Sequence, residues 1–143
     1  MTIHRSSDIK EDQLITKEYA DLTGYDTAAA FTVTGDVEVR IFGIVGTPIT
    51  STSGTTTLSL GTTLAPNQIG FDTNIDGTNF DANFVWADGA CSGDAQLTSR
   101  NFTIIANGAD IIMTRSADDI TAGSIKLYCY WRPTGDGGSV VAA

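Results

Sequence analysis

Short apolar runs separated by closely spaced turn residues are the feature that most constrains the fold of this chain. From residue 29 onward, Gly, Asn-Gly and Pro interrupt the sequence about every eight to twelve residues, a spacing typical of antiparallel sandwiches and barrels. Strand and helix patterns do not alternate, so a parallel sheet is not expected. We therefore predict an all-β fold: a single antiparallel β-sandwich or jelly-roll-like barrel of about seven or eight short strands.

Two turns carry the residues that favour β-hairpins. Gly35-Asp36 divides the runs AFTVT and VEVRIFGIV, and glycine at the first central position is typical of a type II′ turn. Asn107-Gly108 is the strongest short-range signal of a type I′ turn, with residues 102–106 and 109–115 as its predicted arms. We expect the strands on either side of each turn to be hydrogen-bonded neighbours.

The run SIKLYCYWR, residues 124–132, is predicted to be a long final strand. Successive side chains of a strand point to opposite faces, which separates this run into two sets. One set is apolar and should face the core: Ile125, Leu127, Cys129 and Trp131. The other set should face away from it: Lys126, Tyr128 and Tyr130.

The outward set contains the main candidate interface residues. Tyr, Trp and Arg are the usual anchors of protein interfaces. Tyr128 and Tyr130 should contact either a second sheet or a neighbouring subunit, and both alternatives remain open from the residues alone. Arg132 could pair with a carboxylate of a partner.

Residues 1–28 differ from the rest and are predicted to form an N-terminal arm, while residues 29–143 form the β-sandwich domain with a C-terminal tail. Asp8 and Glu11 have capping-box spacing, so the segment from Ile9 to Glu18 could form a short helix; the alternative is an extended arm. The apolar side chains of this segment are further candidate interface residues: Ile9, Leu14 and Tyr19.

Charge and length exclude some partners. The chain has 143 residues, enough for one domain with a single core, and its formal net charge is −9. We expect no nucleic-acid partner, because a phosphate backbone needs lysine and arginine to replace its counterions. We also expect no membrane partner, since no apolar run reaches the roughly 18 residues of a membrane span.

The residues offer little for catalysis or metal binding. The single histidine, His4, lies in the predicted arm, and a catalytic triad centred there would sit outside the core. Cys91 and Cys129 are not in a CxxC motif, and with His4 they cannot complete the roughly four ligands of a structural zinc site. Adjacent acids such as Asp118-Asp119 are typical of solvated turns. We expect no enzyme activity, no cofactor and no metal.

The stretch DTNIDGTNFDAN, Asp72 to Asn83, begins like an EF-hand calcium loop. Asp72, Asn74, Asp76 and Gly77 have the correct spacing. Asn83 then occupies position 12, where an EF-hand needs a bidentate glutamate, and the flanking sequences are not helical. A looser calcium site remains an alternative, but we expect a polar loop in which Asn and Asp bond to their own backbone.

The C-terminal part of the chain resembles a group of small structural proteins from tailed bacteriophages and prophages. ANGADIIMTRSADDITAGSIKLYCYWRPTGDGGSVVAA is similar to their ending of the type NGxDI…ITAGxIxxYCxWRPxSxDGxVxAA. AFTVTGDVEVRIFGIVGTPIT, Ala30 to Thr50, resembles their segment TVTGDVxVRVxGxVxTxxT. Together these segments cover a little under half of the chain, which departs most from the pattern in residues 51–100.

The resemblance implies a virion structural protein, most like a capsid decoration (cement) protein. Such a protein binds the outside of the expanded shell, commonly as a trimer, and stabilises it by bridging subunits of the major capsid protein. The expected localisation is therefore the outer surface of the capsid, after synthesis in the host cytoplasm. Two alternatives remain: another virion component, in the tail or a head fibre, and a carbohydrate- or receptor-binding β-domain.

Overall fold

The computed structural model describes residues 13–75, 79–93 and 102–143, and these residues form thirteen β-strands and no helix. The predicted fold class, an antiparallel all-β sandwich, is confirmed. The strands outnumber the predicted seven or eight because five of them span only two or three residues, too few to produce a visible alternation of apolar and polar side chains. No helix among the described residues has the length and apolar character of a membrane span.

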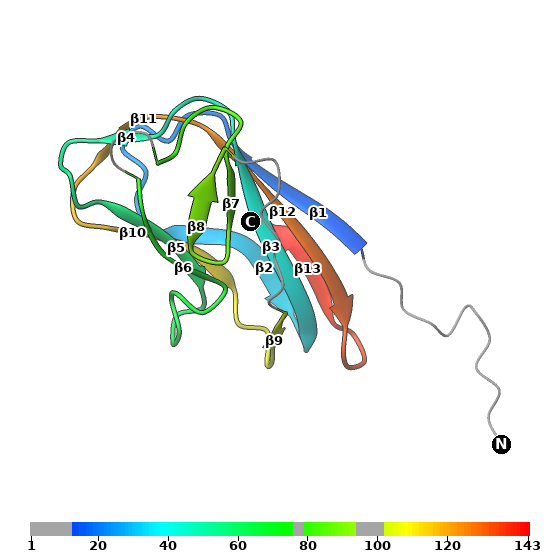
Figure 1. The fold of residues 1–143 in the computed structure, drawn as a ribbon. Helices are drawn as coiled ribbons and strands as arrows, with labels where there is room; N and C mark the ends of the chain where they lie inside the picture. The colour runs from blue at the N-terminus through cyan, green and yellow to red at the C-terminus, as the bar shows by residue number, and fades with distance from the viewer. Residues whose placement is uncertain (1–12, 76–78, 94–101) are drawn as a thin grey trace, which may run out of the picture.

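Six strands form the first sheet, which we call sheet A (Figure 1). They are, in spatial order, β1 (Gln13–Tyr19), β12 (Ile125–Pro133), β3 (Val37–Val45), β7 (Val85–Ala87) and β8 (Ala90–Ser92), with β9 (Thr103–Ile105) also paired to β3. The two neighbouring strands β3 and β12 are the longest in this sheet. β3 and β12 run antiparallel through nine consecutive residue pairs, from Ile125 opposite Val45 to Pro133 opposite Val37.

Five strands form the second sheet, sheet B, and two short strands form a third, sheet C. Sheet B contains, in spatial order, β13 (Ser139–Ala142), β2 (Ala28–Thr34), β10 (Ile111–Ser116), β5 (Thr57–Gly61) and β6 (Gly70–Asn74). Sheet C pairs β11 (Ile120–Ala122) with β4 (Thr50–Ser51). Figure 1 shows sheet C at the end of the sandwich away from β9.

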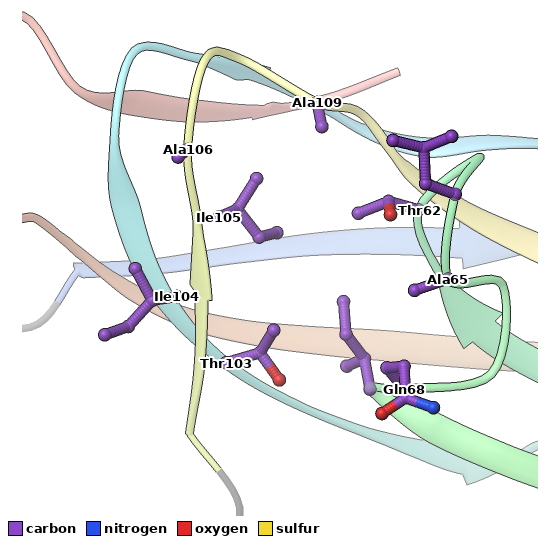
Figure 2. A pocket seen from close by; sticks show the side chains of 10 residues that line it. Thr62, Ala65, Gln68, Thr103, Ile104, Ile105, Ala106 and Ala109 are labelled. Atoms are coloured by element: carbon purple, nitrogen blue, oxygen red, sulfur yellow. The ribbon is translucent and has the colours of Figure 1, made fainter.

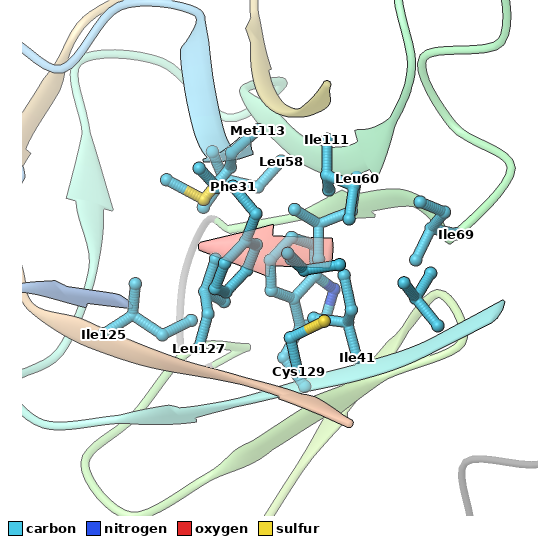
Figure 3. Close-up of a cluster of buried hydrophobic side chains, with 14 of the residues drawn as sticks. Phe31, Ile41, Leu58, Leu60, Ile69, Ile111, Met113, Ile125, Leu127 and Cys129 are labelled. Atoms are coloured by element: carbon cyan, nitrogen blue, oxygen red, sulfur yellow. The ribbon is translucent and has the colours of Figure 1, made fainter. Parts of the chain in front are cut away.

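The core lies between sheets A and B and contains the inward side chains of both (Figure 3). Cys129 and Trp131 of β12 are buried, as the alternation in the sequence predicts. A buried hydrogen bond also links β7 of sheet A to β6 of sheet B, because the Trp86 indole Nε1 donates to the Thr73 Oγ1 at 2.9 Å. The bond satisfies a polar group that would otherwise be costly to bury.

The two predicted hairpins are wrong, although the chain reverses direction at both predicted turns. Gly35 has a φ of 65°, and Asn107 and Gly108 have φ of 59° and 69°. However, β2 belongs to sheet B and β3 to sheet A, while β9 belongs to sheet A and β10 to sheet B. Turn residues determine where the chain reverses, but both arms bury an apolar face, so the arms pack across the core instead of side by side.

These turns meet a third sheet-to-sheet connection, residues 134–138, at one end of the sandwich. Asp36 joins all three: its Oδ1 accepts a hydrogen bond from the Asn107 N–H at 2.9 Å, and its main-chain oxygen accepts one from the Thr134 N–H at 3.0 Å. The Gly108 N–H also donates to the Gly35 carbonyl at 2.9 Å. This Asp36 corner therefore holds the two sheets in a fixed relation.

The described part of the predicted arm is an edge strand and not a helix. β1 pairs with β12 over seven residues, from Gln13 opposite Trp131 to Tyr19 opposite Ile125. Side chains in this segment alternate between the two faces of the sheet, as a strand requires. Leu14 lies on the outer face, and Ile15 lies on the inner face, against the core. Pairing with β12 satisfies the backbone of this segment in an extended form. Residues 1–12 lie outside the described residues.

Gly138 offers a test of the Asp36 corner. A Cβ at this position would lie 2.3 Å from the main-chain oxygen of Asp36, a contact that the backbone must relieve by moving. We expect Gly138→Ala to lower the free energy of unfolding by about 1–3 kcal/mol, measured by urea denaturation. Gly54→Ala is the matched control, since a Cβ there meets no atom within 4 Å. Equal stability of the two variants would contradict a tightly packed corner.

Candidate functional site

The candidate site is the face of sheet A that is turned away from the core. Tyr128 and Tyr130 lie on this face, half-buried, while their neighbours Leu127 and Cys129 are buried inside. Of the two positions that the sequence left open, the structure therefore excludes packing of the two tyrosines between sheets A and B. The register brings Phe42 opposite Tyr128 and Arg40 opposite Tyr130 on the neighbouring strand β3.

Six side chains on this face form a continuous stack, which we call the aromatic column. Its members are, in order, Lys126, Tyr128, Phe42, Tyr130, Arg40 and Phe102. Phe42 and Tyr128 are nearly parallel, with centroids 5.0 Å apart and an interplanar angle of 8°. Phe42 and Tyr130 are 6.3 Å apart at 25°.

A cation lies close to the aromatic rings at both ends of this stack. The Arg40 guanidinium carbon is 5.3 Å from the ring centroid of Tyr130 and 5.5 Å from that of Phe102. The ammonium of Lys126 is 5.4 Å from the ring centroid of Tyr128. Aromatic pairs contribute about 0.5–1.5 kcal/mol beyond their buried area, and exposed cation–π contacts about 0.5–1 kcal/mol. The column is thus ordered before any partner binds.

The charges of this face differ from those of the rest of the protein. Three of the five lysines and arginines in the described residues lie here: Arg40, Lys126 and Arg132. Only two of the twelve described acids do: Glu18 and Glu38. A chain with a net charge of −9 therefore presents one face that is not acidic. Such a face favours an acidic partner surface.

The other predicted interface residues are distributed over both sides of sheet A. Leu14 lies beside the aromatic column, opposite Tyr130, and is about half exposed. Arg132 already binds within the chain, because its Nε and a terminal nitrogen both lie 2.8 Å from the Glu38 Oε2. Tyr19 is on the inner side, where its ring meets that of Tyr25 edge to face at 5.4 Å. Ile9 lies outside the described residues.

Of the column, sequence reasoning named only Tyr128 and Tyr130 as interface residues. It placed Lys126 on the same face without a role, and it missed the other three members: Arg40, Phe42 and Phe102. Alternation of side chains in residues 37–45 is enough to place Arg40 on the half-buried face of its strand. That alternation, however, contains no information on which strand lies alongside. The missing fact was the pairing of β3 with β12, two segments that are far apart in the sequence.

The residues considered for calcium binding take part in the fold instead. Asp72 and Asn74 belong to β6, where Asn74 pairs with Thr57. Ile75 and Phe80 are buried in the core, so the stretch is not the continuous polar loop that its composition predicted. Asp76 lies outside the described residues. Among residues 13–75, 79–93 and 102–143, no group of three or more His, Cys, Asp or Glu could hold a metal ion.

Both cysteines are free thiols. Burial raises the pKa of the Cys91 thiol to about 12, and burial likewise raises the pKa of the Cys129 thiol to about 12. A reactive cysteine needs a thiolate near neutral pH. The two thiols are therefore suited to packing and not to nucleophilic chemistry.

Comparison with solved structures gives a likeness in fold, whereas comparison of the sequence gives no match. No family model matches the sequence, and no curated protein matches it. The fold is similar to that of a chain in the cyanophage Pam1 capsid asymmetric unit, with a TM-score of 0.44 and 9% sequence identity. The similarity covers 93% of this chain and 92% of that chain.

The aromatic column can be tested with a double-mutant cycle. We expect Phe42→Leu and Tyr128→Leu to show a coupling of about 0.5–1.5 kcal/mol in the free energy of unfolding, because each ring loses its stacked partner in the other variant. Phe42→Leu combined with Thr34→Ala, an exposed position on sheet B, is the control and should be additive. A coupling no larger than in the control would show that the rings contribute independently.

The raised thiol pKa values predict slow labelling of the native protein. At pH 8 a thiol with a pKa near 12 has roughly a thousandfold less thiolate than one near 8.5. We expect both cysteines to react with an aromatic disulfide reagent at least about a hundredfold more slowly in the native state than in guanidinium chloride. The native rate should still be rising at pH 10. Fast native labelling at pH 8 would contradict this assignment, and Cys129→Ala identifies which thiol is responsible.

Proposed function

We propose that this protein is a structural component of a tailed-bacteriophage virion and, more specifically, a decoration protein on the outside of the expanded capsid. In this proposal the outer face of sheet A binds the major capsid protein. The observation that carries the proposal is the aromatic column, a pre-ordered aromatic and cationic surface on an otherwise acidic protein. The sequence resemblance at Ala30–Thr50 and over the C-terminal residues indicates the virion.

The geometry of the column favours a protein partner over a sugar. A sugar-binding platform needs an open ring face, whereas the rings of Phe42, Tyr128 and Tyr130 are stacked against one another or lie against a cation. What remains accessible are ring edges, hydroxyl groups and the charged ends of Arg40 and Lys126. Ring edges carry a partial positive charge, and the two cations carry a full one. Carboxylates and main-chain carbonyls are the groups that such a surface attracts.

The shape of the site also suits a stabilising role. A decoration protein needs a large contact surface and not a cleft, because it stabilises the shell by bridging its subunits. Stable interfaces bury about 800 Å² per partner and have aromatic and arginine anchors near their centre. The column supplies such anchors, and Leu14 extends the apolar surface beside it.

The proposed location agrees with the charge of the chain. A protein on the outer surface of the shell has no need to contact the packaged DNA, so a net charge of −9 is no obstacle. We further propose a homo-oligomer, with a trimer favoured. Several copies around one symmetry axis would place several columns on the shell, so that weak contacts reinforce one another.

Rebinding to capsids tests the proposal. Purified protein added to expanded capsids that lack it should bind at a fixed number of copies per particle, counted by electron cryo-microscopy. The variant Arg40→Gln with Lys126→Gln should bind at least about tenfold more weakly, because it loses both cations of the column. Added salt should weaken the capsid binding of this variant less than it weakens the binding of the wild type.

The matched control is Thr32→Glu with Thr34→Glu, which changes net charge by the same amount at exposed positions of β2 on sheet B. This control should bind like the wild type. Binding to tails or fibres but not to capsids would contradict the decoration role and would favour another virion component. Equal losses in the two double variants would show that net charge, and not the column, governs docking.

A further inference from the structure

A second surface, which adjoins the end of the aromatic column at Phe102, is an apolar groove between β9 and the loop that follows β5 (Figure 2). The groove has a volume of about 360 Å³. Thr103 and Ile105 of β9 line one side, and Ala65 and Gln68 of the loop line the other. None of its ten lining residues carries a charge.

Exposed apolar side chains gather around this groove. Five large hydrophobic side chains are exposed in the described residues, and three of them lie here: Leu64 is 97% exposed, Ile104 72% and Phe102 58%. Leu64 and Ile104 line the groove itself, and Phe102 directly precedes β9. Leaving this much apolar surface in water is unfavourable, and a concentration of it marks an interaction site.

Leu64 is held in place by a tight turn. The Thr62 N–H donates to the Ala65 carbonyl at 3.0 Å, and the Ala65 N–H donates to the Thr62 carbonyl at 3.1 Å. Only Thr63 and Leu64 lie between these two residues, so Leu64 projects from a closed loop. The result is an apolar protrusion on a hydrogen-bonded turn, directly beside an apolar groove.

We infer that the groove binds a second copy of this chain, with the Leu64 protrusion of each copy entering the groove of its neighbour. A chain that carries both a protrusion and a groove can contact its neighbours head to tail, with the protrusion of each copy in the groove of the next, and such a contact closes into a ring such as a trimer when the rotation between copies allows it. The net charge of the chain is consistent with a contact at this place. Two chains with a net charge of −9 repel each other, and they can approach at least cost where neither presents an acid.

The same reasoning assigns the two surfaces to different partners. The column is cationic and attracts an acidic surface, whereas the groove is uncharged and matches only an apolar one. The contact between copies does not need the virion role proposed above, and its failure would leave that role intact. Stable interfaces bury about 800 Å² per partner, so Leu64 is the centre of a larger contact and not the whole of it.

Sedimentation of the full chain tests the inference. We expect the wild type to form a species whose mass is a whole multiple of 15.0 kDa, in a concentration-dependent equilibrium. Leu64→Asp should weaken this association at least about tenfold, because it places a charge in the apolar contact. Val141→Asp is the matched control: Val141 is 54% exposed on β13, at the opposite edge of sheet B from β6.

A charge-exchange experiment then tests the insertion itself. Leu64→Lys and Ala106→Glu change two exposed groove residues, so neither should unfold the protein, which circular dichroism can verify. Each variant alone should associate weakly, and an equimolar mixture should recover association, since the new charges attract across the contact. A wild type that stays monomeric up to about 1 mM would overturn the inference. So would equal effects of Leu64→Asp and Val141→Asp, or a mixture that fails to recover.

Discussion

The antiparallel pairing of β3 with β12 is the interaction on which the rest of the structure depends. Nine consecutive residue pairs fix the register, and because side chains alternate, that register determines both faces of the sheet at once. Inside, it places Cys129 beside Ile41 in the core. Outside, it places Tyr128 beside Phe42 and so builds the aromatic column. A slip by one residue would destroy the core and the candidate site together.

Alternation along a single strand could be predicted, but neighbours in space could not. The run from Ile125 to Arg132 showed that Trp131 is buried and that Tyr130 points away from it, because strand geometry alone requires this. The turns at Gly35 and Asn107 were also visible. Whether their arms pair within one sheet or cross between two depends on where apolar faces find each other, which is a property of the whole chain.

The two proposed contacts meet at β9. Ile104 of this strand lies opposite Glu38 of β3, and it lines the groove together with Thr103 and Ile105. Phe102, directly before β9, lies against Arg40 at the end of the aromatic column. A short strand therefore separates a surface suited to an acidic partner from one suited to a second copy. Assembly of the copies would fix the spacing of the columns that face the shell.

The pre-ordered column also has a consequence for how long a complex lasts. Binding normally immobilises long side chains, at about 0.5–1.5 kcal/mol for each. In this protein folding has already restrained Lys126, Arg40 and the rings between them through mutual stacking. That entropy is lost before the partner arrives, so more of the contact energy remains to oppose separation. The benefit would appear as a longer residence time on the partner, with little change in the rate of encounter.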